Sequence, residues 1–255
     1  IQLGVARLPA IAKDNTDRNR TSPFAFTGNK FEFRAVGSSA SISFPSACLN
    51  AAVTDGIDQI VKWIEGGDDV LVAIRKALTE SSPVRFDGNG YSAEWVEEAE
   101  RRGLPHARNT PDALAFLHTP AAQGLFERTH VLSREELHSR YDVRLELYNK
   151  KVDIEADVLK ELVDTQVIPS VLAETEAVNG VPGTLAHSRK AAIDKAGSDI
   201  LAARGALDEA LAAVPEGSAA DVAAYLCRAF VPAIAALRGA ADASEKIVAD
   251  HRWSL

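Results

Sequence analysis

The sequence predicts an α+β chain that is predominantly helical and that ends in an antiparallel helical bundle. Strand and loop signals are confined to residues 1–46, whereas later residues show the apolar spacing of helices, interrupted at Gly and Pro. From Ser133 onward the predicted helices become long and the breaks between them few. We therefore expect two domains, residues 1–132 and residues 133–255.

Helices are predicted in order along the first domain after its strand region. Over residues 48–65, apolar side chains recur at helical spacing until two glycines stop the pattern. Residues 69–80 form a second predicted helix. Ser92 is a favoured N-cap for a helix over residues 93–102, and Pro111 suits the first turn of the next helix.

The second domain begins with a strong helix-start signal. Ser133 and Glu136 have the spacing of a capping box. Pro169 falls inside the apolar pattern that follows, so the helix should kink or end there. Breaks at residues 179–183 and 214–218 then separate two Ala-rich helices of bundle length. Since no fixed repeat period is present, a bundle is favoured over a repeat array.

Composition places the chain among acidic, soluble proteins. It has 255 residues, 46% apolar residues and a formal charge of -8. No Lys or Arg run is dense enough for nucleic acid, and no apolar run reaches the roughly twenty residues of a membrane helix. The chain begins at Ile1 and contains no Met, so we expect it to be part of a longer protein.

The cysteines and histidines give no metal or redox pattern. Cys48 and Cys227 stand far apart in apolar surroundings and are expected to be buried thiols, which favours a cytoplasmic location. The six histidines are scattered, with no pair at helical spacing, so a structural or solvated role is favoured over metal binding.

Chemistry is concentrated in a short predicted strand over residues 30–35. Charged and apolar residues alternate, so Lys30, Glu32 and Arg34 share one face while Phe31 and Phe33 share the other. An ordinary amphipathic strand with its charges in water would show the same pattern.

The segment before this strand favours a binding site over that alternative. Arg18 and Arg20 lie on a stretch rich in Asn, Thr, Ser, Pro and Gly, the composition of an ordered loop that presents side chains. Arginine forks bind carboxylate or phosphate, and a lone Glu can ligate Mg²⁺ or Mn²⁺. The combination indicates phosphoryl chemistry on an anionic substrate.

Three blocks of sequence carry a resemblance to a known family. The longest reads Asn-Arg-Thr-Ser-Pro-Phe-Ala-Phe-Thr-Gly-Asn-Lys-Phe-Glu-Phe-Arg over residues 19–34, and it resembles the signature of type III glutamine synthetases. Residues 86–105, starting Phe-Asp-Gly-Asn-Gly-Tyr-Ser, and residues 131–141, starting Val-Leu-Ser, are similar to later motifs of that family. The resemblance extends from about Leu8 to Ala173.

The resemblance implies a fold and a set of roles. Residues 1–132 would be the carboxy-terminal portion of a glutamine synthetase catalytic barrel, and residues 133–255 a family-specific helical domain. Arg20 and Arg34 would be catalytic and bind the substrate, contacting the glutamate carboxylate and the transferred phosphoryl group. Lys30 would bind the nucleotide phosphates and Glu32 the metal. The implied cofactors are ATP and Mg²⁺ or Mn²⁺.

The resemblance also implies an activity and partners for a complete enzyme. That enzyme would use ATP to ligate ammonia to L-glutamate through γ-glutamyl phosphate, as a homo-oligomer of stacked rings such as a dodecamer. Ala25 stands where many relatives have a further Arg, and the amino-terminal part with the other metal ligands and the ammonium site is missing. Two alternatives stay open: a related γ-glutamyl-amine ligase, and a catalytically incomplete helical assembly module.

Overall fold

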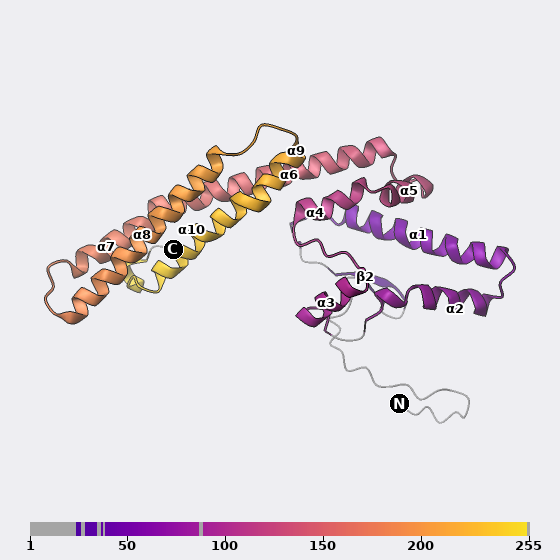
Figure 1. Ribbon diagram of the computed structural model, residues 1–255, viewed down its shortest axis with the longest axis horizontal. Helices are drawn as coiled ribbons and strands as arrows, with labels where there is room; N and C mark the ends of the chain where they lie inside the picture. Colours follow the sequence, from indigo (N-terminus) through magenta and orange to yellow (C-terminus); the bar gives the residue numbers. More distant parts are fainter. Residues whose placement is uncertain (1–23, 27–28, 35–36, 38, 87–88, 254–255) are drawn as a thin grey trace, which may run out of the picture. The chain divides into compact units, whose positions relative to one another are not determined.

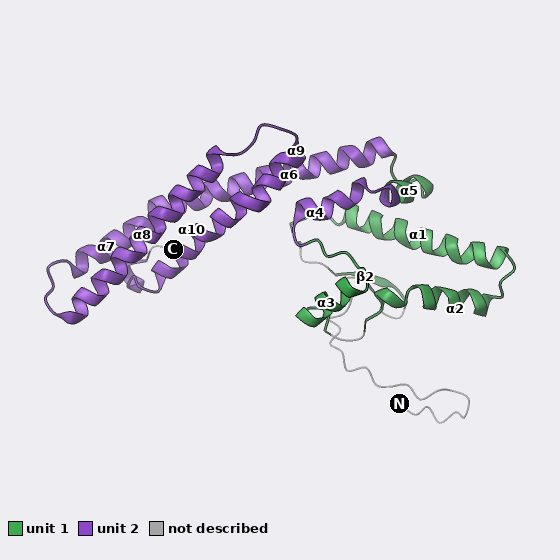
Figure 2. Ribbon diagram, in the orientation of Figure 1, with its two compact units in different colours: residues 1–107, 123–133 green, residues 108–122, 134–255 purple. Residues whose placement is uncertain are grey.

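The protein is predominantly helical, as the sequence predicts. The computed structural model describes residues 24–26, 29–34, 37, 39–86 and 89–253 (Figure 1). Two compact units are distinguished in Figure 2: residues up to 107 together with 123–133, and residues 108–122 together with 134–255. The domains 1–132 and 133–255 have other bounds than these units and remain predictions.

The first unit contains a small β-hairpin. Strands β1 (Phe24–Phe26) and β2 (Phe31–Phe33) pair antiparallel, with Ala25 opposite Glu32. The rings of Phe24 and Phe31 stack with their centroids 4.7 Å apart. The sheet seen in the described residues has these two strands, which are too few to show a barrel. The catalytic-barrel portion therefore stays a prediction.

Helices α1 (Ser43–Glu65) and α2 (Val70–Glu80) pack against each other in the same unit. The first begins five residues before the predicted start at Cys48, because Pro45 lies in its first turn, where a missing N–H costs no hydrogen bond. It ends at Glu65, with Gly66 as its C-cap, as predicted. The Asp69 side chain accepts a hydrogen bond from the Leu71 amide at 2.9 Å and so caps α2.

Short helices connect this pair to the rest of the chain. A 3₁₀ turn, η2 (Ser82–Val84), leads to α3 (Ala93–Arg101), where the Ser92 hydroxyl accepts from the Trp95 amide as the predicted N-cap. The next elements are α4 (Thr110–Ala115), the 3₁₀ turn η3 (Phe116–His118) and α5 (Pro120–Arg128).

The second unit contains the predicted bundle, built from three long helical rods. The first rod runs through α6 (Arg134–Leu162), η4 (Val163–Val167) and α7 (Ile168–Val178); the second is α8 (Thr184–Ala212); the third runs through α9 (Ala219–Tyr225), η5 (Leu226–Phe230) and α10 (Val231–Glu245). Successive rods reverse direction at the two predicted Gly- and Pro-containing breaks (Figure 1). Their shared core includes Val163, Ile193, Ile200, Leu207, Phe230 and Leu237.

Proline placement explains an irregularity in the first and third rods. Pro169 and Pro232 each follow a single π-helical turn, η4 and η5 respectively. A proline inside an α-helix lacks its N–H and clashes with the carbonyl one turn earlier, and a wider turn relieves that crowding. The rods therefore continue through both prolines, where the sequence predicts a kink or an end at Pro169.

The third rod corrects one expectation. Because η5 carries the helix through Pro232, the continuous segment Ala219–Glu245 is long and apolar enough to cross a membrane by length and composition. The sequence analysis found no such run. Its buried residues, including Phe230 and Leu237, belong to the bundle core, and 22% of the apolar window of this segment is buried.

A buried charge network joins α7, α8 and the last turn of the chain that the structure describes. Glu174 on α7 is 2% exposed, and its carboxylate accepts hydrogen bonds from Arg189 at 2.6 and 2.9 Å and from Arg252 at 3.0 Å. Arg252 belongs to the 3₁₀ turn η6 (Asp250–Arg252). Burial by itself raises the pKa of Glu174, but the bonds from Arg189, the Ala249 amide and Arg252 outweigh it and lower this pKa.

The two cysteines are half-buried rather than fully buried. Cys227 lies in η5, near the Tyr148 side chain. Burial, together with the neighbouring thiol, raises the pKa of Tyr148 to about 12.

Candidate functional site

Three of the four predicted site residues gather at the end of the hairpin. The Arg34 guanidinium donates to Glu32 Oε2 through Nη2 at 2.8 Å and through Nε at 3.2 Å. The Lys30 ammonium lies 3.6 Å from Glu32 Oε1. Two cations therefore converge on one carboxylate, on the strand face that the alternation predicts.

The electrostatics of this group keep Glu32 ionised. The hydrogen bond from Arg34 lowers the pKa of Glu32; burial opposes this effect, and the charges of Arg34 and Lys30 lower the pKa further. An ionised carboxylate is the form that ligates a hard divalent cation.

The two faces of β2 differ from an ordinary amphipathic strand. The Glu32 and Arg34 side chains are 34% and 26% exposed, whereas the Lys30 side chain is 66% exposed. Phe31 and Phe33 on the other face are 56% and 39% exposed. Glu32 and Arg34 are thus partly covered, which counts against the interpretation in which these two charges belong to a solvated outer face.

The fourth predicted site residue, Arg20, lies outside the described residues, as does Arg18. Among the described residues, no three His, Cys, Asp or Glu side chains come together in a group that could hold a metal ion. Glu32 fits Mg²⁺ or Mn²⁺ as a single carboxylate ligand, and Lys30 and Arg34 fit the phosphate oxygens that would accompany such an ion.

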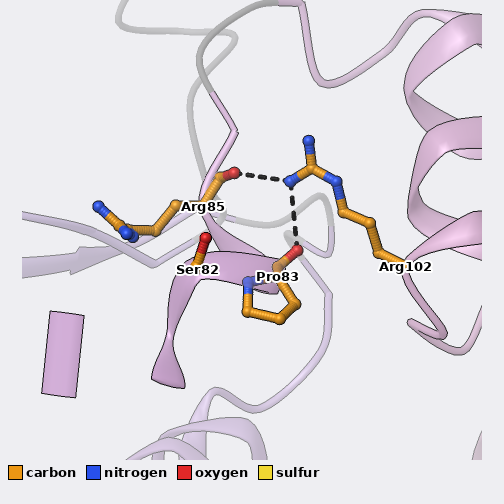
Figure 3. A pocket seen from close by; sticks show the side chains of 4 residues that line it. All are labelled: Ser82, Pro83, Arg85 and Arg102. Carbon is orange, nitrogen blue, oxygen red and sulfur yellow. Dashed lines mark hydrogen bonds between the residues drawn. The ribbon is translucent and has the colours of Figure 1, made fainter. Parts of the chain in front are cut away.

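A surface hollow of about 470 Å³ lies elsewhere in the first unit, lined by Ser82, Pro83, Arg85 and Arg102 (Figure 3). Arg102 Nη1 donates to the carbonyl oxygens of Arg85 at 2.8 Å and Pro83 at 3.3 Å. Arg85 in turn donates to the Leu78 carbonyl at the end of α2, at 2.7 Å.

These contacts give Arg102 a role that the sequence analysis missed. Glu98 and Arg102 belong to a charged cluster whose simplest interpretation is a solvated helix face. In the structure Arg102 Nε donates to Glu98 at 2.7 Å, and its guanidinium lies 5.3 Å from the centroid of the Trp95 ring. Trp95 also stacks on Phe86. Arg102 therefore joins α3 to the loop that precedes it.

A second group that the sequence did not reveal lies in the second unit. His118 Nε2 and His138 Nδ1 are 3.1 Å apart, and His138 Nε2 lies 3.3 Å from Asp142 Oδ2. The ring of Tyr141 packs on His118 with centroids 3.9 Å apart. Twenty residues separate the two histidines, so helical spacing could not pair them; the four-residue step from His138 to Asp142 was the one visible signal.

Comparison with known proteins shows which family this chain is similar to. Residues 69–181 match the family described as the glutamine synthetase C-terminal domain. The chain is 41% identical over 192 residues to a protein of Dictyostelium discoideum named type-3 glutamine synthetase, a match that covers 71% of this chain and 26% of that protein.

Bacterial relatives give the same result. A glutamine synthetase of Bacteroides fragilis is 40% identical over 177 residues, covering 66% of this chain and 24% of the relative. One of Butyrivibrio fibrisolvens is 37% identical over 175 residues, covering 63% and 24%. The chain thus spans about a quarter of the length of the curated relatives that it matches.

Proposed function

Because the chain belongs to the type III glutamine synthetase family, we propose that it supplies the carboxy-terminal part of an ATP-dependent glutamate-ammonia ligase. The complete enzyme forms γ-glutamyl phosphate from ATP and L-glutamate, and ammonia then displaces phosphate to give L-glutamine. The observation that carries the proposal is the cluster of Lys30, Glu32 and Arg34 on one strand face, with Arg34 and Lys30 both contacting Glu32. It occurs in a chain about 40% identical to named glutamine synthetases.

The side chains of this cluster have distinct roles in the proposal. Arg34 binds the glutamate carboxylate and the phosphoryl group through its planar fork, and Arg20 contacts the same two groups from the preceding segment. Lys30 neutralises the nucleotide phosphates as a point charge. Phosphoryl transfer depends on such positioning and charge neutralisation more than on covalent help from the protein.

Glu32 connects this cluster to the divalent cation. Its carboxylate is one ligand of Mg²⁺ or Mn²⁺, and the rest of the ligand set comes from substrate and from the longer protein. When bound, the cation neutralises charge that develops on the phosphate oxygens. Arg34 holds Glu32 at 2.8 Å, which keeps the carboxylate ionised and fixes its direction on the strand.

A substitution at Glu32 tests this function in the full-length enzyme that carries the chain. Glu32→Gln removes the charged ligand but keeps the shape, so we expect ATP- and ammonium-dependent glutamine formation to fall and to require more Mg²⁺ or Mn²⁺. Glu97→Gln is the matched control, since Glu97 is an exposed carboxylate on α3. An unchanged metal requirement in the Glu32 variant would contradict the proposed role.

Two other functions remain as alternatives, and each has its own measurement. A γ-glutamyl-amine ligase would release phosphate faster with an organic amine than with ammonium. A catalytically incomplete assembly module would form no glutamine when purified at 27.3 kDa, the mass of the chain, and would show no affinity for ATP or glutamate. An active polypeptide several times heavier would support the ligase instead.

Assembly and location complete the proposal. We place the full enzyme in the cytoplasm as a homo-oligomer of stacked rings, with a dodecamer as the specific expectation. Light scattering of the purified enzyme measures its particle mass, and a monomer at all concentrations would contradict ring assembly.

A further inference from the structure

We propose that His118 and His138 form a binding site for one borderline divalent cation of the Zn²⁺ or Cu²⁺ type, with Asp142 orienting His138. The site lies entirely within the second unit, on η3 and α6, and it is independent of the strand face that carries Glu32. It rests on the convergence of two imidazole nitrogens, a carboxylate behind one of them, and access from solvent.

The distance between the two rings suits a shared cation. His118 Nε2 and His138 Nδ1 are 3.1 Å apart. Two imidazole nitrogens at the usual Zn–N distance of about 2.05 Å stand about 3.3 Å apart in a tetrahedral shell. A small rotation of the rings about their outer side-chain bonds closes that difference and turns both lone pairs toward one ion.

Asp142 provides the support that a ligating histidine requires. Its carboxylate lies 3.3 Å from His138 Nε2, one helical turn along α6. A proton on Nε2 can therefore be donated to Asp142, which leaves the Nδ1 lone pair free to face His118. Carboxylates behind metal-bound histidines fix the ring and its tautomer in this way.

The proton between the rings shows how an ion would enter. With His138 Nδ1 as acceptor, His118 Nε2 donates the proton that the two neutral rings share. A cation takes the place of this proton at Nε2, and exchange with solvent returns a proton to Nδ1, so His118 becomes the neutral Nδ1–H tautomer. Water completes the coordination shell.

The surroundings hold the ligands in place and leave them accessible. Tyr141 packs against His118, and the Thr119 hydroxyl donates to the Phe116 carbonyl at 2.8 Å, which closes the η3 turn that ends at His118. The His138 side chain is 63% exposed. Imidazole ligands favour Zn²⁺, Cu²⁺ and Ni²⁺ over Mg²⁺, so the site should leave the magnesium chemistry at Glu32 undisturbed.

Calorimetric titration of the whole chain with Zn²⁺ at about pH 7.5, where free imidazole is mostly neutral, tests the proposal. We expect one Zn²⁺ bound by the His pair, no heat with Mg²⁺ at this site, and loss of the bound equivalent in His118→Gln and in His138→Gln. Asp142→Asn should weaken binding about tenfold or more. His187→Gln is the matched control, because His187 contacts the Gly183 carbonyl on another helix.

A spectroscopic measurement keeps the test decisive if a variant folds poorly. Electron paramagnetic resonance of Cu²⁺ bound to the unsubstituted chain should show coupling to two imidazole nitrogens. Coupling to fewer nitrogens, or equal Zn²⁺ binding by the unsubstituted chain and the double variant His118→Gln/His138→Gln, would overturn the proposal. Loss of the same binding in His187→Gln would also overturn it, by placing the ion elsewhere.

Discussion

At the scale of one residue, the planar guanidinium group of Arg34 makes contacts that another cation could not reproduce. It donates two hydrogen bonds to the same oxygen of Glu32, and in the proposed reaction the same fork faces the substrate carboxylate and phosphoryl oxygens. A lysine would keep the charge but present a single flexible ammonium group.

Arg34→Lys in the full-length enzyme should therefore lower turnover by about 10²-fold or more, the usual cost of losing one positioned donor at a developing charge. Folding should be nearly unaffected, since a lysine keeps a positive charge beside Glu32 in this short hairpin. Steady-state kinetics together with thermal melting would check both parts. Turnover close to that of the unsubstituted enzyme would mean that this strand face does not contact substrate.

Glu174 provides the strongest residue-scale prediction on stability. Glu174→Gln leaves Arg189 and Arg252 without their shared carboxylate, inside a bundle where that carboxylate is 3% exposed. Because the side chains of Arg189 and Arg252 are 42% and 32% exposed and can be solvated, we expect a loss of about 1.5–3 kcal/mol, the range for hydrogen bonds to charged groups. Chemical denaturation followed by circular dichroism should show this loss, whereas Asp199→Asn, in the exposed Lys195–Asp199 pair on α8, should change little.

The pH dependence of stability follows from the same carboxyl. The pKa of Glu174 is lowered in the folded chain from its ordinary value of 4.5, so its stabilisation is complete above that value and is lost as pH falls through the lowered pKa. Unfolding free energies measured from about pH 5 downward should therefore decline more steeply in the unsubstituted chain than in Glu174→Gln. Parallel curves would assign the acid sensitivity to other groups.

At the scale of elements, the sequence predicts helices well where local chemistry decides. Ser92 caps α3, the glycines after Glu65 end α1, and α6 begins at Arg134, directly after the predicted start signal at Ser133. These features depend on backbone groups within one turn, which the sequence displays directly.

Features that depend on long-range contacts were not predictable in the same way. Two contacts join residues many positions apart: the contact between His118 and His138, and the hydrogen bonds from Arg102 to the Pro83 and Arg85 carbonyls. No periodicity in the sequence predicts them. The Lys30–Glu32–Arg34 group was predictable, because alternation along a strand places these side chains on one face.

The π-helical turn η4 supports an element-scale prediction. Val163 and Val167 at its ends are both buried, and Arg204 of α8 donates to Asp164 within it at 3.0 Å. A π-helical turn holds one residue more than an α-helical turn, so deleting Thr165 together with Pro169→Ala would let the rod continue as an α-helix without rotating the residues beyond it. Glu174 would then keep its partners.

We therefore expect this double change to keep most of the bundle's unfolding free energy, measured by urea titration with circular dichroism. Pro169→Ala alone should cost about 1 kcal/mol or less, because the buried valines keep the wide turn in place. Loss of most of the unfolding free energy in the double variant would show that the wide turn does not act as a one-residue insertion.

At the scale of the whole molecule, the two units differ in how much they bury. The second unit has a continuous apolar core that includes Phe230 and Leu237. In α1 and α2 the buried residues are Ala51 and Ala73, while large apolar side chains such as Ile57 and Leu71 are 55% and 64% exposed. Amide groups are protected from exchange where burial makes opening costly.

Hydrogen exchange followed by mass spectrometry should therefore show α1 and α2 exchanging well before α8 and α10 in the isolated chain. In the full-length enzyme, slower exchange in α1 and α2 would indicate that other parts of the protein cover their apolar side chains. If α1 and α2 exchanged as slowly as α8 in the isolated chain, the expected difference between the units would be wrong.

The two π-helical turns have one more consequence, for the axial position of the rods. Val163 and Val167 of η4 and Leu226 and Phe230 of η5 belong to the same core, where η4 packs on α10 and η5 packs on α8. In a uniform coiled coil, one helix can slip past its neighbours by a turn and meet equivalent side chains. Here a slip would move each wide turn away from the side chains that it packs against, so the bundle has a single favoured axial register.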